Sequence, residues 1–504
     1  MTARIIDRTD RMADAYDLVV IGAGPAGLAA ATEASRRGVK VIVIDENPAP
    51  GGQIYRSVTR GNPDAMPFLG PDYWSGKPLA DAFLASASDY APGATVWSLE
   101  PATAAAEGAP ALARIGVSQA GAARIINATV VILATGAMER PMPVPGWTLP
   151  GVMTAGAAQI ALKSAAIVPS GRVVLAGCGP LIYLLAAQLI EAGAEIAALL
   201  DTTDRRRYLP ALPYLPDFMR SPYVAKGLSL LLKVRRAVKV VSGVETLRIE
   251  GEGTAQAVAF RTGNTERTIA ADCVLLHQGV VPNVNLASAA GCAIAWNERQ
   301  RAFQPVADAH GRSSLPGIYI AGDGAGIGGA KHAEVAGRLT AIAALADAGL
   351  GDTGVGELGP GGLDRRATAE LERQRRRFLR GRAFLDTLYT PAPGFRAPRA
   401  PETIVCRCEE VRAGALREIV ALGVPGPNQL KTFVRCGMGP CQGRMCALTV
   451  SEIMADERGV SPADIGIYRF RAPVKPVRLS EIAAMPHTPS AVLAVTGHAP
   501  EDGP

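Results

Sequence analysis

Aromatic residues are scarce in this chain, at 5% of its 504 positions, and no stretch interleaves them with basic side chains. The net charge of +6 is also small for this length. Proteins that bind nucleic acids usually combine a clustered basic surface with aromatic side chains that stack on bases. The composition therefore argues against a nucleic-acid partner.

The chain also lacks a signal peptide and a convincing membrane span. Residues 1–15 mix arginines with aspartates and have no apolar core, so they do not form a signal sequence. Residues 173–190 carry no charge and have the length of a span, but the Gly-Cys-Gly-Pro within them is typical of a turn between strand and helix. Five of the eight cysteines lie between Cys406 and Cys446. This crowding favours metal ligation in a reducing cytoplasm over disulfides.

The first chemical motif is a glycine turn between an apolar strand and a helix. In a G-x-G-x-x-G turn the first glycine permits the tight turn, the second lets a pyrophosphate approach the backbone, and the third lets helix and strand pack closely. The phosphates then lie at the positive end of the helix. Asp45 ends the next strand and can accept hydrogen bonds from a ribose, with Glu46 as the alternative. The turn consists of Gly22, Ala23, Gly24, Pro25, Ala26 and Gly27.

Three later segments have the character of cofactor contacts. Gly51-Gly52-Gln53 is either a loop that passes close to a flat ring, with Gln53 on the ring edge, or an ordinary Pro-Gly turn. Ala134-Thr135-Gly136 follows a buried strand and can place backbone amides against a cofactor. Gly322-Asp323 ends another strand, where the carboxylate can hydrogen-bond a ribityl hydroxyl and the next helix can face a flavin ring.

A second glycine turn lies at residues 177–182, but Ile182 replaces its third glycine. Two alternatives remain: a working NAD(P) site with altered packing, or a retained fold that no longer binds nicotinamide. The following segment, residues 218–241, has the pattern of an inserted amphipathic helix with several lysines and arginines. Its basic face is either simply solvated or a subunit contact.

The second chemical centre is a set of paired cysteines near the C-terminus. Cys406 and Cys408 form a CxC pair, and Cys436 and Cys441 follow after 27 intervening residues. Zinc sites usually have two residues between paired cysteines, so this spacing favours a [2Fe-2S] cluster over zinc. We expect Cys441 to lie at the start of a helix, whose dipole stabilises a thiolate, and Cys446 to point elsewhere.

The order of motifs in residues 17–345 resembles the two-dinucleotide-fold flavoprotein oxidoreductases, in which the first site holds FAD and the second NAD(P)H. That resemblance implies an FAD domain interrupted in sequence by the second fold. No CxxC pair occurs in this region, which argues against a disulfide-reductase mechanism. Carried over residue by residue, it implies FAD contacts at Gly22, Ala23, Gly24, Pro25, Ala26, Gly27, Asp45 or Glu46, Gly52, Gln53, Ala134, Thr135, Gly136, Gly322 and Asp323.

The cysteine segment resembles bacterioferritin-associated-ferredoxin-like [2Fe-2S] domains. Residues 16–474 as a whole, with the segments 136–159 and 435–446, resemble the α or A subunits of multi-subunit amine and imino-acid dehydrogenases. That group includes opine oxidases, D-hydroxyproline dehydrogenase, hydrogen cyanide synthase and sarcosine oxidase. The resemblance implies a β subunit of the D-amino-acid-oxidase type that carries the substrate site, and it allows an FMN at the subunit boundary and a small ferredoxin-like γ subunit.

The predicted function is an electron relay. None of the five histidines lies in a motif that supplies a general base, and no nucleophile–base pair is apparent. We expect electrons from an amine oxidised in the partner subunit to pass through flavin and the [2Fe-2S] cluster to an acceptor. The alternatives are an autonomous NAD(P)H-dependent reductase, which Ile182 disfavours, and a subunit with a purely structural role.

The predicted fold class is α/β, with two dinucleotide-binding folds and a small α-rich cysteine domain. We expect an N-terminal extension (1–15), an FAD domain in two parts (16–165 and 286–348) and an inserted NAD(P)-type domain (166–285). The chain should continue through a Gly/Pro-rich linker with a basic helix (349–401) to the [2Fe-2S] domain (402–460). Residues 461–504 form a C-terminal extension whose last twenty or so residues we expect to be disordered.

Overall fold

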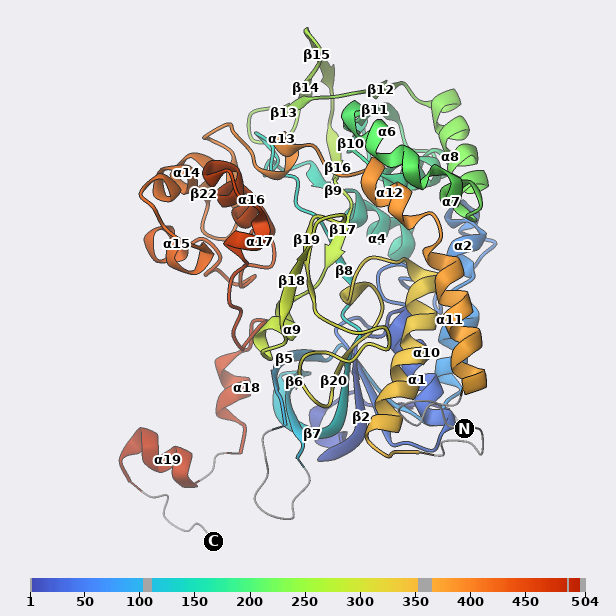
Figure 1. Ribbon diagram of the computed structural model, residues 1–504, viewed down its shortest axis with the longest axis vertical. Helices are drawn as coiled ribbons and strands as arrows, with labels where there is room; N and C mark the ends of the chain where they lie inside the picture. The colour runs from blue at the N-terminus through green and yellow to red at the C-terminus, as the bar shows by residue number, and fades with distance from the viewer. Residues whose placement is uncertain (1, 103–110, 352–364, 487–488, 499–504) are drawn as a thin grey trace.

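The computed structural model describes residues 2–102, 111–351, 365–486 and 489–498 (Figure 1). The predicted α/β class is correct, because two sheets with flanking helices lie one above the other and a small helical domain lies beside them (Figure 1). Within the described residues, no helix combines the length and the apolar character needed to cross a membrane.

The first sheet lies in the lower part of Figure 1 and has the order β1-β4-β3-β2-β7-β6-β5, with β20 also paired to β7. β20 comes from a distant part of the sequence, so the first fold is discontinuous, as predicted. The strands are β1 (Arg4–Ile5), β2 (Ala15–Ile21), β3 (Val41–Asp45), β4 (Asp89–Pro92), β5 (Thr95–Glu100), β6 (Ala113–Gln119), β7 (Ala122–Leu133) and β20 (Ile318–Ile320).

Helices α1 (Pro25–Arg36) and α10 (Ala330–Asp347) cover one face of this sheet side by side (Figure 1). A Cβ atom added to Gly337 of α10 would lie 2.1 Å from the carbonyl oxygen of Ala26, so the two backbones are nearly in contact. The short helices α2 (Pro71–Trp74) and α3 (Lys77–Leu84) complete this layer. Leu18 and Val20 of β2 belong to the buried core beneath it.

The second sheet is fully parallel and has the order β12-β11-β10-β16-β9. A separate antiparallel sheet, β13-β14-β15, projects from it (Figure 1). The strands are β9 (Val152–Thr154), β10 (Val173–Gly177), β11 (Ile196–Asp201), β12 (Val240–Ser242), β13 (Thr246–Glu250), β14 (Ala257–Thr262), β15 (Thr265–Ala270) and β16 (Cys273–His277). The helices are α4 (Ala155–Ala165), α5 (Pro180–Glu191), α6 (Tyr208–Ala211), α7 (Leu215–Met219) and α8 (Tyr223–Ala237). The amphipathic helix predicted in residues 218–241 is therefore present as α8.

The chain crosses between the two folds on the antiparallel pair β8 (Ala137–Glu139) and β17 (Val280–Pro282). The helix α9 (Asn285–Ala289) follows, and then the hairpin of β18 (Ile294–Asn297) and β19 (Ala302–Pro305) returns the chain to the first fold.

Most of the predicted linker, residues 352–364, lies outside the described residues. The predicted basic helix that follows it is two helices, α11 (Arg365–Leu379) and α12 (Arg382–Leu388). Gly381 separates them in a left-handed conformation, with φ of +80°, which ends the first helix.

The cysteine domain has its own buried core beside the second fold (Figure 1). The chain reaches this domain through α13 (Pro393–Arg396). The domain contains β21 (Ile404–Cys406), β22 (Val411–Arg412), α14 (Ala413–Ala421), α15 (Pro427–Val434), α16 (Ala447–Arg458) and α17 (Pro462–Ile465). Two further helices, α18 (Leu479–Ala483) and α19 (Pro489–Thr496), extend from it towards the C-terminus. The tail that we expect to be disordered includes α19, while residues 487–488 and 499–504 lie outside the described residues.

Candidate functional site

The first glycine turn has the geometry that its motif predicts. Gly22 has φ of +109°, and a Cβ there would lie 2.4 Å from the carbonyl oxygen of Ala134. A Cβ on Gly27 would lie 1.9 Å from the carbonyl oxygen of Gly22. Both positions therefore exclude side chains because backbone from β7 and from the turn itself fills the space.

The loop with Gly51-Gly52-Gln53 lies directly on this turn. The amide of Gly51 donates to the carbonyl oxygen of Ala23 (2.8 Å), and a Cβ on Gly52 would lie 2.8 Å from the Cα of Gly24. A Cβ on Gly24 would meet nothing closer than the Cα of Gly52, at 4.0 Å. Two glycine loops thus form a narrow cradle lined by backbone, which suits close approach of a pyrophosphate.

Asp45 lies against the same turn but is held by the chain itself. Its carboxylate accepts from the amides of Ala23 (2.5 Å) and Asn47 (2.7 Å), and the residue is 7% exposed. Burial raises the pKa of Asp45, and the two backbone hydrogen bonds oppose that shift. The alternative acid, Glu46, forms an ion pair with Lys475 (2.7 Å).

The remaining predicted contacts meet at the same carboxyl edge of the sheet. Gly324 lies beside Thr135 and Gly136, since a Cβ there would be 3.6 Å from the Gly136 amide and from the Thr135 hydroxyl. A Cβ on Gly322 would lie 2.7 Å from the Cβ of Ala26. One oxygen of Asp323 accepts from the amides of Gly328 (2.8 Å) and Gly329 (2.9 Å), just before α10. The residues that the sequence selected for FAD therefore converge, and their glycine-lined surface fits such a group.

Lys163 is a polar neighbour of this cradle that sequence reasoning missed. It is 3% exposed, and its Nζ donates to the carbonyl oxygen of Gln53 (3.2 Å) and to the side chain of Gln159 (2.9 Å). Burial, aided by the nearby Arg56, lowers the pKa of Lys163 to about 7. Its place on α4 among alanines gave no sequence signal, because only the tertiary packing brings α4 to the glycine loop.

The second glycine turn is closely packed by side chains and backbone of the chain itself. Ile182, at the third glycine position, is fully buried. Asp201, at the end of β11, accepts hydrogen bonds from the Tyr183 hydroxyl (2.7 Å) on one oxygen and from Thr203 on the other. The Cys178 thiol contacts the carbonyl oxygen of Tyr389 (3.5 Å), so the segment after α12 lies against the turn.

A buried histidine–carboxylate pair joins the two folds, which the sequence did not indicate. The Nδ1 of His277, at the end of β16, lies 2.5 Å from the carboxylate of Glu139 on β8. The other oxygen of Glu139 accepts from the amide of Gly156 (2.7 Å) at the start of α4. His277 is 2% exposed. The two residues are far apart in sequence, so no local spacing could reveal them.

The cysteines form one cluster of three and a neighbouring pair. The sulfur atoms of Cys406, Cys436 and Cys446 lie within 4.8 Å of one another, in a buried site that could hold a metal. Burial raises the pKa of Cys408, and the neighbouring Cys441 thiol adds to that shift. A Cβ on Gly439 would lie 2.3 Å from the Cβ of Cys408, so this position requires glycine.

Two expectations about this loop are wrong. Cys446 does not point elsewhere but joins Cys406 and Cys436. Cys446 is also the residue at the N-terminus of α16, whereas Cys441 lies in the preceding turn. Hydrogen bonds from Cys436 and then Cys446 lower the pKa of Cys406, while the pKa of Cys446 is raised well above its ordinary value.

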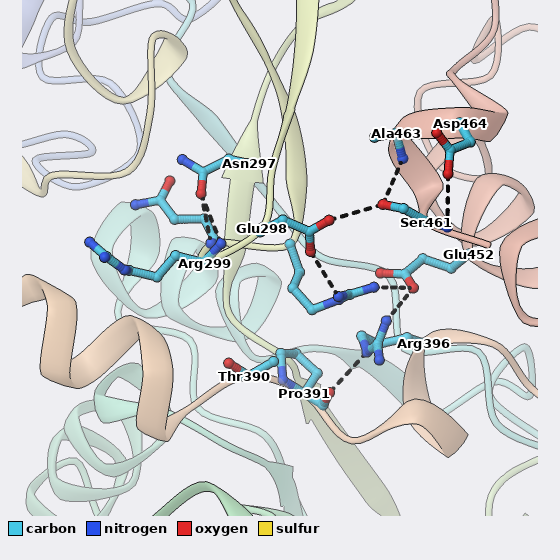
Figure 2. A network of polar contacts seen from close by, with 12 residues as sticks. Asn297, Glu298, Arg299, Thr390, Pro391, Arg396, Glu452, Ser461, Ala463 and Asp464 are labelled. Carbon is cyan, nitrogen blue, oxygen red and sulfur yellow. Dashed lines mark hydrogen bonds and ion pairs between the residues drawn. The ribbon is translucent and has the colours of Figure 1, made fainter. Parts of the chain in front are cut away.

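A charged network holds the cysteine domain to the rest of the chain (Figure 2). Glu452 on α16 is 4% exposed and pairs with Arg396, in α13, and with Arg301 (3.2 Å), in the β18–β19 hairpin. Glu298 of the same hairpin accepts a hydrogen bond from Ser461 (2.9 Å) of the cysteine domain (Figure 2). Burial lowers the pKa of the nearby Arg140 to about 10, with Glu452 opposing and Arg396 adding to the shift. The buried carboxylate of Glu452 thus balances part of the positive charge of several arginines.

The fold and the glycine-lined site define an oxidoreductase of the flavoprotein type. Residues 16–339 match the family model described as pyridine nucleotide-disulphide oxidoreductase, and residues 400–486 match the sarcosine oxidase A3 domain. Among curated proteins, the chain is 59% identical to the opine oxidase A subunit of Agrobacterium tumefaciens (strain Ach5), covering 100% of this chain and 98% of that one. It is 57% identical to the opine oxidase A subunit of Rhizobium meliloti, covering 100% and 94%.

The chain belongs to the pyridine nucleotide-disulphide oxidoreductase family. Its identity to these relatives over nearly their whole length also places it in the family of opine oxidase A subunits. The predicted resemblance is confirmed. A solved structure of L-proline dehydrogenase from P. horikoshii has the same fold, with a TM-score of 0.68 at 18% identity, covering 96% of this chain and 80% of that one.

Proposed function

We propose that this chain is the electron-relay subunit of a hetero-oligomeric dehydrogenase or oxidase that acts on a secondary amine, an opine or an imino acid. The observation that carries the proposal is the presence, in one chain, of a glycine-lined dinucleotide cradle and a buried cluster of thiols. The relatives named as opine oxidase A subunits support the substrate class.

The first site is proposed to bind FAD through the two glycine loops and the loops at Gly136 and Gly322. When bound, FAD can accept two electrons and release them singly, which is the chemistry a relay requires. The chain contributes a desolvated surface and the positive end of α1, which favours a phosphate. Lys163 donates a hydrogen bond to the carbonyl oxygen of Gln53 and so holds the Gly51-Gly52-Gln53 loop in place.

The cysteine domain is proposed to bind a [2Fe-2S] cluster. Such a cluster takes four thiolates, and we assign them to Cys406, Cys408, Cys436 and Cys441. Their backbone supports this assignment, because Gly439 leaves room for Cys408 beside Cys441. Cys446 then lies next to two of the ligands without being one.

The second fold is proposed not to bind NAD(P). Asp201 has both oxygens engaged by Tyr183 and Thr203, and Tyr389 lies against the glycine turn at Cys178. A nucleotide would have to displace these contacts and find room beside the buried Ile182. The chain therefore depends on another protein for its electrons.

That protein is proposed to be a β subunit of the D-amino-acid-oxidase type, which contains the substrate pocket. Further proposed components are an FMN at the boundary of the two subunits and a small ferredoxin-like γ subunit. Free thiols at the cluster require a reducing compartment, which favours the cytoplasm.

The test is cofactor analysis of the chain expressed alone, followed by addition of NADH under anaerobic conditions. Flavin and about two irons per chain, unreduced by NADH, are expected for a relay subunit. Rapid bleaching of the flavin by NADH would instead make the chain an autonomous reductase. A colourless protein without iron would indicate that the chain has a purely structural role.

A further inference from the structure

Residues Asn283, Val284 and Asn285 connect β17 to α9, of which Asn285 is the first residue, and they touch both proposed redox sites. At one end, the amide of Asn283 donates to the carbonyl oxygen of Gly136 (3.0 Å). The carbonyl oxygen of the same residue accepts from the Thr135 hydroxyl (3.3 Å). This end of the segment is therefore fixed to a loop that the first site is built from.

The other end of the segment belongs to the cysteine domain. Val284 is 5% exposed and forms part of the same buried core as Cys406 and Cys436. The side-chain amide of Asn285, which is 7% exposed, donates to the carbonyl oxygen of Gln442 (3.4 Å), the residue after Cys441. Contacts to the two sites are therefore separated by only one residue of backbone.

The surfaces around this segment are apolar and closely packed. A cavity of about 30 Å³ remains between them, room for one or two water molecules. Its walls come from both sides of the joint and include Met138, Val281 and Phe303 of the flavoprotein part and Ala447, Leu448 and Phe470 of the cysteine domain. Side chains of the two parts therefore approach each other closely along this groove, which opens to solvent.

A second contact joins the domains farther from the first site. The indole nitrogen of Trp147 donates to the carbonyl oxygen of Ile404 (2.6 Å), two residues before Cys406. Trp147 lies well along the chain from Gly136, whereas Asn283 bonds to Gly136 directly. The shorter connection therefore runs through residues 283–285.

We propose that residues 283–285 are the path by which electrons pass from the first site to the cysteine cluster, and that Asn285 positions the Cys441 loop for this transfer. The inference rests on the proposed relay function. In each transfer, one electron leaves the reduced flavin and reduces the oxidised [2Fe-2S] cluster. The flavin releases its proton to solvent as its oxidation completes, and the cluster passes its electron to a one-electron acceptor before the next transfer.

The test compares Asn285→Ala with Asn127→Ala in the full chain. Asn127 is a matched control, because its side-chain amide also donates to a backbone carbonyl, that of Asp14 (3.2 Å), at the far end of the first sheet. The flavin is reduced by a light pulse in anaerobic protein, and cluster reduction is followed by absorbance and by electron paramagnetic resonance. Flavin content, iron content and both reduction potentials are measured in each variant.

Asn285→Ala is expected to retain both cofactors and both potentials but to slow cluster reduction by about tenfold to a hundredfold, as loss of positioning does. Asn127→Ala should leave the rate unchanged, and Asn285→Gln, which keeps a donor, should recover part of it. If Asn285→Ala does not fold, Val284→Ala serves the same comparison.

An unchanged rate in Asn285→Ala overturns the inference, and so does slowing by Trp147→Phe instead. Absence of flavin or iron from the wild-type chain would refute the relay function itself, and the inference with it. Wild-type protein with both cofactors and an unaffected Asn285→Ala variant would refute only the path.

Discussion

At the scale of single residues, the backbone of the first site leaves no room for a side chain at Gly22 or Gly27. The gaps at Gly22 and Gly27 are filled by carbonyl oxygens rather than by movable side chains. A methyl group at either place must therefore displace the strand, the turn or the helix.

Gly27→Ala is accordingly expected to destabilise the chain by about 1–3 kcal/mol and to lower its flavin content, because the added Cβ would lie 1.9 Å from the Gly22 oxygen. Denaturant unfolding and flavin absorbance measure the two effects. Gly227→Ala, in α8, is the control. Nothing lies within 4 Å of a Cβ there, so this change should stabilise the helix by up to about 1 kcal/mol. Equal effects of the two substitutions would contradict the steric argument.

The burial of Lys163 determines how the free energy of unfolding of the chain changes with pH. Its pKa is lowered to about 7 from 10.5, so between these values the unfolded chain binds more protons than the native one. The free energy of unfolding should therefore rise as the pH increases from about 7 towards 10.5, by up to about 1.4 kcal/mol per pH unit. At and below pH 7 this gain is absent.

Lys163→Met should remove this dependence. The free energy of unfolding of wild type should therefore rise relative to that of the variant between about pH 7 and about pH 9. Denaturant titrations at several pH values measure it. Lys77→Met, at a half-exposed lysine paired with Asp81 (2.7 Å), is the control and should not alter the slope. Parallel pH profiles for wild type and Lys163→Met would rule out a buried, desolvated amine.

At the scale of elements, the segment from α12 to α13 joins parts that are otherwise separate. Tyr389 lies against the second glycine turn, Phe395 is 2% exposed in the core of the second fold, and Arg396 pairs with Glu452 of the cysteine domain. The same segment therefore closes the second site and anchors the cysteine domain.

Glu452→Ala should destabilise this joint by about 3–5 kcal/mol, because it leaves the buried Arg396 without its carboxylate partner and Arg301 with only the exposed Glu298. Thermal and denaturant unfolding of the full chain measure the loss. Glu250→Ala is the control, since its pair with Arg248 (2.6 Å) is solvent-exposed and contributes at most about 1 kcal/mol. A loss no larger than that of the control would mean that the buried network does not hold the domains together.

At the scale of the whole molecule, the proposed relay depends on how the two proposed cofactor-binding parts are joined. The cysteine domain lies beside the second fold (Figure 1), and the short segment around Asn285 connects it with the first site. The cysteine domain contains five neighbouring thiols, one more than the number of ligands that a [2Fe-2S] cluster binds.

Cys436→Ser should lose iron, whereas Cys446→Ser should keep about two irons per chain but shift the cluster's reduction potential, since hydrogen bonds to the sulfurs help set it. Iron analysis and a redox titration distinguish the two. Cys273→Ser, at a buried cysteine of the second fold, is the control. Loss of iron in Cys446→Ser together with its retention in Cys441→Ser would place Cys446, and not Cys441, among the ligands.

The sequence alone determined the elements whose signals are local. The glycine turns, the strands before them and the amphipathic helix α8 all follow from short-range patterns, because each element depends on residues a few positions apart. The same holds for the cysteine pairs as a metal-binding signature, and for the class of oxidoreductase.

Only the tertiary structure decided what lies between distant segments. The position of Cys446 depends on where the loop after Gly439 turns, and the break at Gly381 depends on a left-handed residue that ends α11. The pairs His277–Glu139, Lys163–Gln53 and Tyr389–Cys178 join residues from different elements, and no spacing in the sequence predicts them. Local patterns specify elements, whereas contacts between elements depend on the packing of side chains and on the burial of charge.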